Sequence, residues 1–229
     1  MEIVVIAVFV VAFIAAAWFA HKAAAERRRA LAELAARLGL RFYPDEDDGH
    51  DDDYAQFEIF RRGHSRVARN TLSGALELFG RPCAVRAGDF RYKVTSGSGK
   101  SRSTRTHRFS YLIVQPPWQT PPLLIRREGV MDKIAGAFGF DDIDFESVEF
   151  SKRFYVKSSD KRFAYDVLHP RMMEFLLASE PLMLDLEGGA LCISDGSRCW
   201  DPAGFEQQIA FVRQFCELWP RHLLATLEA

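Results

Sequence analysis

Neither sign of charge dominates this sequence of 229 residues. The 30 lysines and arginines are balanced by 31 aspartates and glutamates, which gives a formal net charge of −1. A chain without excess positive charge has no overall field that draws it to nucleic acid. We therefore predict no nucleic-acid partner.

Cysteine is also scarce. The four cysteines are Cys83, Cys192, Cys199 and Cys216, and none of them forms a CxxC pair. No two histidines have the His-x₃₋₅-His spacing, so the pattern argues against a zinc site, and we predict neither a metal nor a cofactor. Scattered cysteines are typical of reduced, buried thiols in a cytoplasmic domain. A Cys192–Cys199 disulfide is the alternative if the domain lies outside the cytoplasm.

Charge and proline are both absent from Ile3 to Ala20, at the start of the chain. Eighteen helical residues span about 27 Å, close to the thickness of the hydrocarbon core of a bilayer. Trp18 lies near the end of this run, where an aromatic ring favours the membrane interface. The run predicts a transmembrane anchor over residues 1–21.

The flanking charges predict the orientation of this anchor. Only Glu2 precedes it, whereas four basic residues follow it, and the positive-inside rule then places the N-terminus outside and the rest of the chain in the cytoplasm. These basic residues are also candidates for contacts with lipid headgroups: Lys22, Arg27, Arg28 and Arg29. A cleaved signal peptide, with Ala15–Ala17 before the cleavage site, and a buried core helix are the competing interpretations.

The helix is expected to continue as a stalk over residues 22–39. Leu31, Leu34, Ala35 and Leu38 recur at i, i+3, i+4 and i+7 and form one apolar stripe, and Gly39 is a stop signal. The later turns of the stalk are expected to dock on the domain.

Two acidic segments follow. Residues 40–53 are predicted to be an acidic linker, because seven carboxylates between Asp45 and Asp53 favour a hydrated chain. A calcium loop does not fit, since Pro44 and Ala55 take the places of the required Asp and Glu. The second segment runs from Asp141 to Glu149, and such carboxylates either face water or take part in acid–base chemistry.

Gly97 to Ser101, with the sequence GSGKS, resembles a phosphate-binding loop. Val94 stands where the P-loop requires its first glycine, and the segment leads into a strand rather than a helix. We predict a hairpin tip instead. Its basic residues are candidates for contact with phosphate groups or an acidic partner: Lys100, Arg102, Arg105 and Arg108.

The remaining chain, residues 54–229, is predicted to form one cytoplasmic α+β domain. Short alternating runs separated by glycines indicate strands in hairpins. Capping residues followed by apolar stripes indicate helices, among them one that begins at Asp201-Pro202. The expected fold is an antiparallel sheet of hairpins packed with helices, joined by the stalk to one transmembrane helix.

Several short stretches resemble a bacterial, membrane-anchored family of uncharacterised proteins, domain of unknown function 3137. The matching stretches are Arg69-Asn70 to Gly74, Asp89 to Tyr92, Asp144 to Val156, Ser158 to Asp160, Ala164, Leu168 to Pro170 and Met172 to Leu176. Members typically combine a membrane-spanning region with a soluble domain. The resemblance therefore implies an anchored architecture and supplies no catalytic residues.

Three functional hypotheses follow. The first is a non-catalytic binding or scaffolding module that is tethered to the inner membrane of a bacterium and has an unknown protein partner. The second is an enzyme or ligand-responsive domain that combines Asp141 to Glu149 with the basic hairpin Lys100 to Arg108. The third is engagement of lipid headgroups by the stalk arginines. Burial of the acidic cluster distinguishes the first two hypotheses.

Overall fold

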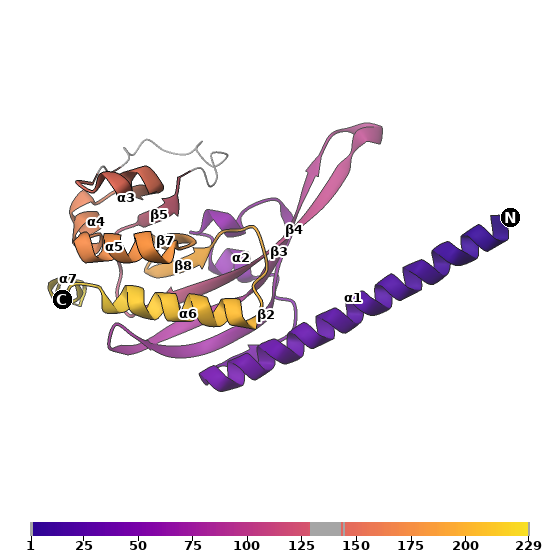
Figure 1. The fold of residues 1–229 in the computed structure, drawn as a ribbon, viewed down its shortest axis with the longest axis horizontal. Helices are drawn as coiled ribbons and strands as arrows, with labels where there is room; N and C mark the ends of the chain where they lie inside the picture. Colours follow the sequence, from indigo (N-terminus) through magenta and orange to yellow (C-terminus); the bar gives the residue numbers. More distant parts are fainter. Residues whose placement is uncertain (1, 129–142, 144, 229) are drawn as a thin grey trace.

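A long, unbroken helix dominates the N-terminal part of the structure, a computed structural model that describes residues 2–128, 143 and 145–228 (Figure 1). Helix α1 runs from Glu2 to Leu38, a length of about 55 Å. The large apolar side chains that the structure describes between Ile6 and Phe19 are exposed; Phe13, for example, is 75% exposed. This exposure excludes the core-helix interpretation.

The other end of α1 packs on the domain as the stripe predicts. Leu31, Leu34 and Ala35 are fully buried. Gly39 has a φ of 71°, and the amides of Gly39 and Leu40 donate to the carbonyls of Ala36 and Ala35, at 3.2 and 2.8 Å. This arrangement is a Schellman motif, which ends the helix at the predicted glycine.

One antiparallel sheet of eight strands forms the centre of the domain, in the order β1-β2-β3-β4-β8-β7-β5-β6. The hairpins β2–β3, β3–β4 and β7–β8 join strands that are consecutive in the chain. The strands are β1 Arg41–Tyr43, β2 His64–Leu78, β3 Arg81–Ser96, β4 Ser103–Gln115, β5 Leu123–Arg127, β6 Phe154–Ser158, β7 Met183–Glu187 and β8 Ala190–Ser194.

Helices cover this sheet and confirm the predicted α+β class. The predicted caps are present: Asp160 and Asp201 accept hydrogen bonds from the amides of Phe163 and Gly204. The helices are α2 His50–Asp53, α3 Val148–Arg153, α4 Lys161–Val167, α5 Pro170–Ser179, α6 Pro202–Glu217 and α7 Arg221–Leu227, with 3₁₀ turns η1 Glu58–Phe60 and η2 Gly99–Ser101.

The alternation of side chains along the central strands separates two cores. Val85 and Ala87 face a large core that also contains the docked end of α1 and helices α3 to α6. Phe90 and Tyr92, on the opposite face of β3, belong to a smaller aromatic core under α2 and η1. Asp89 lies on the same face as Ala87 and therefore points toward α1.

The segment predicted as an acidic linker, residues 40–53, is part of the domain. Arg41–Tyr43 pairs with β2 as strand β1, and Asp47 forms an isolated bridge with Ala68. Arginines compensate the carboxylates that the sequence analysis assigned to water, in the pairs Asp47–Arg86 at 2.7 Å, Asp51–Arg66 at 2.6 Å and Glu46–Arg91 at 3.1 Å. These arginines come from β2 and β3, so local charge density alone does not reveal them.

Candidate functional site

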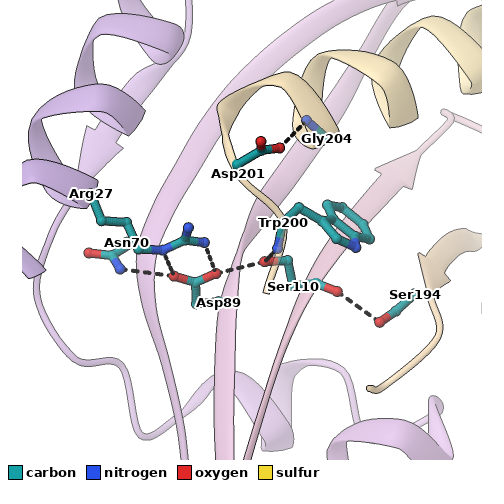
Figure 2. Close-up of polar contacts among 8 residues, drawn as sticks. All are labelled: Arg27, Asn70, Asp89, Ser110, Ser194, Trp200, Asp201 and Gly204. Carbon is teal, nitrogen blue, oxygen red and sulfur yellow. Dashed lines mark hydrogen bonds and ion pairs between the residues drawn. The ribbon is translucent and has the colours of Figure 1, made fainter. Parts of the chain in front are cut away.

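A buried carboxylate, Asp89 on β3, lies where the anchor helix meets the sheet (Figure 2). This residue is only 1% exposed. Arg27 of α1 donates to it from Nε at 2.8 Å and from Nη2 at 2.6 Å, a bidentate ion pair. Asn70 Nδ2 donates at 3.0 Å and Ser110 Oγ at 2.7 Å. Asp89 therefore joins α1 to strands β2, β3 and β4.

A bulge in β2 brings Asn70 to this carboxylate. The register between β2 and β3 shifts between Arg69 and Leu72, so that Asn70 and Thr71 lie opposite the single residue Gly88. Asn70 has a φ of 51°, a left-handed conformation that asparagine tolerates better than most residues. A Cβ atom on Gly88 would lie 3.1 Å from the carbonyl oxygen of Arg69, so a larger residue there would crowd the backbone of the bulge.

Ser110 extends the junction to the C-terminal part of the chain. Its Oγ accepts a hydrogen bond from the Trp200 amide at 2.9 Å, and its carbonyl accepts one from Ser194 Oγ at 2.8 Å. Trp200 directly precedes Asp201, the N-cap of α6. Arg37 of α1 also contacts Glu206 of α6 at 2.7 Å. Helix α1 is thereby attached to both the sheet and α6.

The electrostatics of this junction suit a structural role. Burial by itself raises the pKa of Asp89, but the hydrogen bonds and charge of Arg27, followed by Asn70 and Ser110, hold that pKa below its ordinary value. Asp89 is therefore a permanent anion rather than a general base near neutral pH. Ser110 is fully buried, so a substrate has no access to its hydroxyl. We call the set Arg27, Asn70, Asp89 and Ser110 the anchor junction.

A second buried titratable group, His50, lies on the other face of the sheet. It is fully buried among the rings of Tyr54, Phe60, Phe90 and Tyr111, with ring centroids 4.6–5.7 Å away. Burial, and then the charge of Arg86, lower its pKa to about 3. His50 is therefore neutral at physiological pH and acts as part of an aromatic core.

A surface hollow of about 720 Å³ lies beside β5, β6 and β7. Asp185 lines it together with the carboxylates Glu58 and Glu187 and the basic residues Arg61, Arg62 and Lys157. Burial, and then the charges of Glu187 and Glu58, raise the pKa of Asp185 to about 7. Asp185 can therefore exchange a proton near neutral pH.

In the part of the chain that the structure describes, no group of three or more His, Cys, Asp and Glu residues is arranged to hold a metal.

The basic residues of the stalk, predicted as headgroup contacts, have different surroundings. Arg27 is turned into the anchor junction and bound to Asp89, so it is a structural residue. Lys22 contacts Glu26 at 3.9 Å and Arg29 contacts Glu33 at 3.0 Å, both as exposed pairs along the helix. Arg28 is exposed.

The predicted basic hairpin is present, as the outer part of β3 and β4. Arg102, Arg105 and Arg108 are exposed on it, and Lys100 lies in the turn η2. The strand that follows the GSGKS sequence is β4, as expected from the failed P-loop pattern.

The acidic cluster is not combined with this hairpin in the described residues. Glu146 is exposed, and Glu149 is 70% exposed and contacts Arg153 of its own helix α3 at 3.4 Å. Figure 1 shows α3 and the hairpin at opposite ends of the domain. Asp141, Asp142 and Asp144 lie outside the described residues.

The anchor junction is not among the predicted sites, although β3 contains a signal for it. Val85, Ala87 and Asp89 alternate on one face, so an acidic residue continues an apolar, inward-facing row. A charged residue at a buried position requires a partner. The identity of that partner, a stalk arginine 62 residues earlier, depends on the tertiary fold.

The four cysteines are free, and Cys83, Cys192 and Cys216 are buried, as predicted for reduced thiols.

Within the described residues, α1 is the one helix that is long and apolar enough to cross a membrane. Such a helix is compatible with a single-pass membrane protein.

No protein-family model matches the chain, and no curated protein is similar to it in sequence. Its fold is similar to the crystal structure of the mycobacterial trehalose monomycolate transport factor A, TtfA, with a TM-score of 0.59 over 84% of this chain and 96% of that chain. The sequence identity is 15%, so the likeness establishes a shared fold alone. The resemblance to the uncharacterised family remains a prediction.

Proposed function

We propose that this chain is a single-pass protein of the bacterial cytoplasmic membrane, with its N-terminus outside and its domain in the cytoplasm. In this proposal the domain is a non-catalytic module that binds a protein of a membrane transport assembly. The unbroken helix α1, exposed and apolar at one end and docked through the anchor junction at the other, is the observation that carries it.

The chemistry of the described residues supports a binding role. The buried polar side chains where α1 meets the sheet form a closed network. Their donors and acceptors are hydrogen-bonded to one another. Such a network fixes the position of the domain relative to the membrane span, which benefits a module that presents a surface to a membrane partner. The similarity of the fold to that of the mycobacterial transport factor A supports a transport-associated partner.

Capture of partners from intact membranes tests this proposal. Cells that produce the tagged full-length chain are crosslinked, solubilised in mild detergent and subjected to affinity purification and mass spectrometry. We expect an integral membrane transport protein to be reproducibly enriched. A variant that lacks residues 2–20 is the control, because the side chains described between Ile6 and Ala20 are exposed and their removal leaves the domain packing intact.

The control should lose this enrichment while it retains the circular dichroism of a folded domain. Equal recovery of the same partner by both forms would show that the anchor is unnecessary for binding. Recovery of soluble proteins alone would contradict the proposed membrane partner.

A further inference from the structure

The hairpin between β3 and β4 carries basic residues without any acidic neighbour in sequence. From Phe90 to Arg127 the chain contains no aspartate or glutamate. In a protein with a net charge of −1, this stretch is an isolated region of positive charge. Its basic residues within the hairpin are Arg91, Lys93, Lys100, Arg102, Arg105 and Arg108.

The outer part of this hairpin is a two-stranded ribbon that leaves the sheet. Strand β2 ends its pairing with β3 at Lys93, and β8 pairs with β4 from Leu112 onward. Beyond these points β3 and β4 pair only with each other, as far as Ser96 and Ser103. Core packing does not explain this extension, because the side chains described between Val94 and Arg105 are exposed or half-buried.

Charge on the ribbon is largely uncompensated. Arg91 and Arg108 lie directly opposite each other in the register, an arrangement of like charges that destabilises a strand pair. Glu46 contacts Arg91 at 3.1 Å. Within the described part of the chain, no ion pair engages Arg102, Arg105 or Arg108. Arg105 and Arg108 differ in parity along β4, so they lie on opposite faces of the ribbon. The ribbon therefore presents positive charge on both faces, which suits an anion from outside the domain.

The ribbon points to the side of the molecule from which the apolar end of α1 extends (Figure 1). The contact between Arg27 and Asp89 gives the helix and the ribbon a common starting point. From Arg27 to Ala20 the helix rises about 10 Å, whereas from Asp89 to Ser96 the strand extends about 23 Å. The tip therefore reaches the level of Ala20 unless the ribbon is inclined to the helix by more than about 60°.

We propose that the ribbon from Lys93 to Arg108 binds the headgroups of anionic phospholipids in the leaflet next to the domain. This inference rests on the proposed membrane span, because α1 brings the lipid surface within reach of the ribbon. Guanidinium groups bind phosphate through paired hydrogen bonds, and anionic lipids attract clustered basic residues. Binding at a second point would hold the domain at a fixed orientation to the bilayer.

A lipid surface fits these observations better than a nucleic acid or a free nucleotide. The P-loop pattern fails at Val94, and the chain as a whole has no excess positive charge. The membrane, by contrast, is present beside the ribbon at all times and at high local concentration. An acidic protein is the remaining anion, and the experiment distinguishes it from lipid.

Hydrogen–deuterium exchange of the full-length protein in lipid nanodiscs tests the proposal. Discs of phosphatidylcholine alone are compared with discs that contain phosphatidylglycerol. We expect the amides from Val94 to Arg105 to exchange several-fold more slowly in the anionic discs. This protection should disappear in 1 M salt, because screening by the ions reduces the range of electrostatic interactions to about 3 Å.

Matched charge variants identify the residues responsible. Arg102→Gln combined with Arg105→Gln should remove most of the protection, since each basic residue near such a surface strengthens binding about fivefold. Arg171→Gln combined with Arg213→Gln removes the same charge from exposed positions on α5 and α6 and should leave the protection unchanged.

The anchor is checked separately by flotation of the reconstituted protein after alkaline carbonate extraction. Protein that floats but shows equal ribbon exchange in both lipids would overturn the headgroup proposal and leave the membrane span intact. Release by carbonate would instead contradict the span itself. Protection that appears only after a soluble acidic protein is added would assign the ribbon to a protein partner and overturn the lipid assignment.

Discussion

Replacing Arg27 with alanine is expected to destabilise the domain by about 3–5 kcal/mol, because it leaves a buried carboxylate without its counter-charge. Asp89 is 1% exposed and receives two of its hydrogen bonds from Arg27. Urea unfolding in detergent, followed through the fluorescence of the buried tryptophans Trp118, Trp200 and Trp219, measures the loss.

Arg29→Ala is the matched control two residues along the same helix. Arg29 is 84% exposed and contacts only Glu33 in the described structure, so its loss should change stability by less than about 0.5 kcal/mol. Combining Arg27→Ala with Asp89→Asn should recover part of the stability, since the neutral amide needs no counter-charge. Similar small effects for Arg27→Ala and Arg29→Ala would contradict the role of the anchor junction.

Two buried groups are expected to give opposite pH dependences of stability. His50 has a pKa of about 3 in the folded protein and an ordinary value of 6.5, so its contribution is present above pH 6.5 and is lost as the pH falls. Asp185 has a folded pKa of about 7 and an ordinary value of 3.8, so its contribution is present below pH 3.8 and is lost as the pH rises through 7. Between about pH 4 and 6.5 the two effects oppose each other.

Single substitutions should therefore expose a dependence that the unmodified protein conceals. In Asp185→Asn the His50 contribution remains, and stability should fall as the pH drops from 6.5 to 4.5, by up to about 1.4 kcal/mol per pH unit. In His50→Phe stability should rise over the same range. Urea unfolding at the two pH values measures both slopes. Slopes that match the unmodified protein in both variants would contradict the assigned burial of these groups.

Local sequence patterns predict the elements of this protein well where the interactions are local. The stripe Leu31, Leu34 and Ala35 is buried, Gly39 ends α1, and Asp160 and Asp201 cap their helices. Each of these features depends on residues within two turns of each other. The expected α+β class follows from their order along the chain.

Features that depend on distant residues are less apparent in the sequence. Residues 40–53 are acidic enough to favour a hydrated linker, yet Arg66, Arg86 and Arg91 compensate their charge and make them part of the domain. Arg27 belongs to a basic cluster that suits lipid headgroups, but the buried Asp89 binds it. Partners that are 15 to 62 residues away come together only when the sheet forms, so the sequence does not show them.

Protease protection of a C-terminal tag in intact spheroplasts tests the central claim most directly. If α1 spans the membrane with its N-terminus outside, a tag after Ala229 should resist added protease and be digested once detergent opens the membrane. The protein should also stay in the membrane fraction after alkaline carbonate extraction. Digestion of the tag in intact spheroplasts would place the domain outside the cytoplasm and contradict the account.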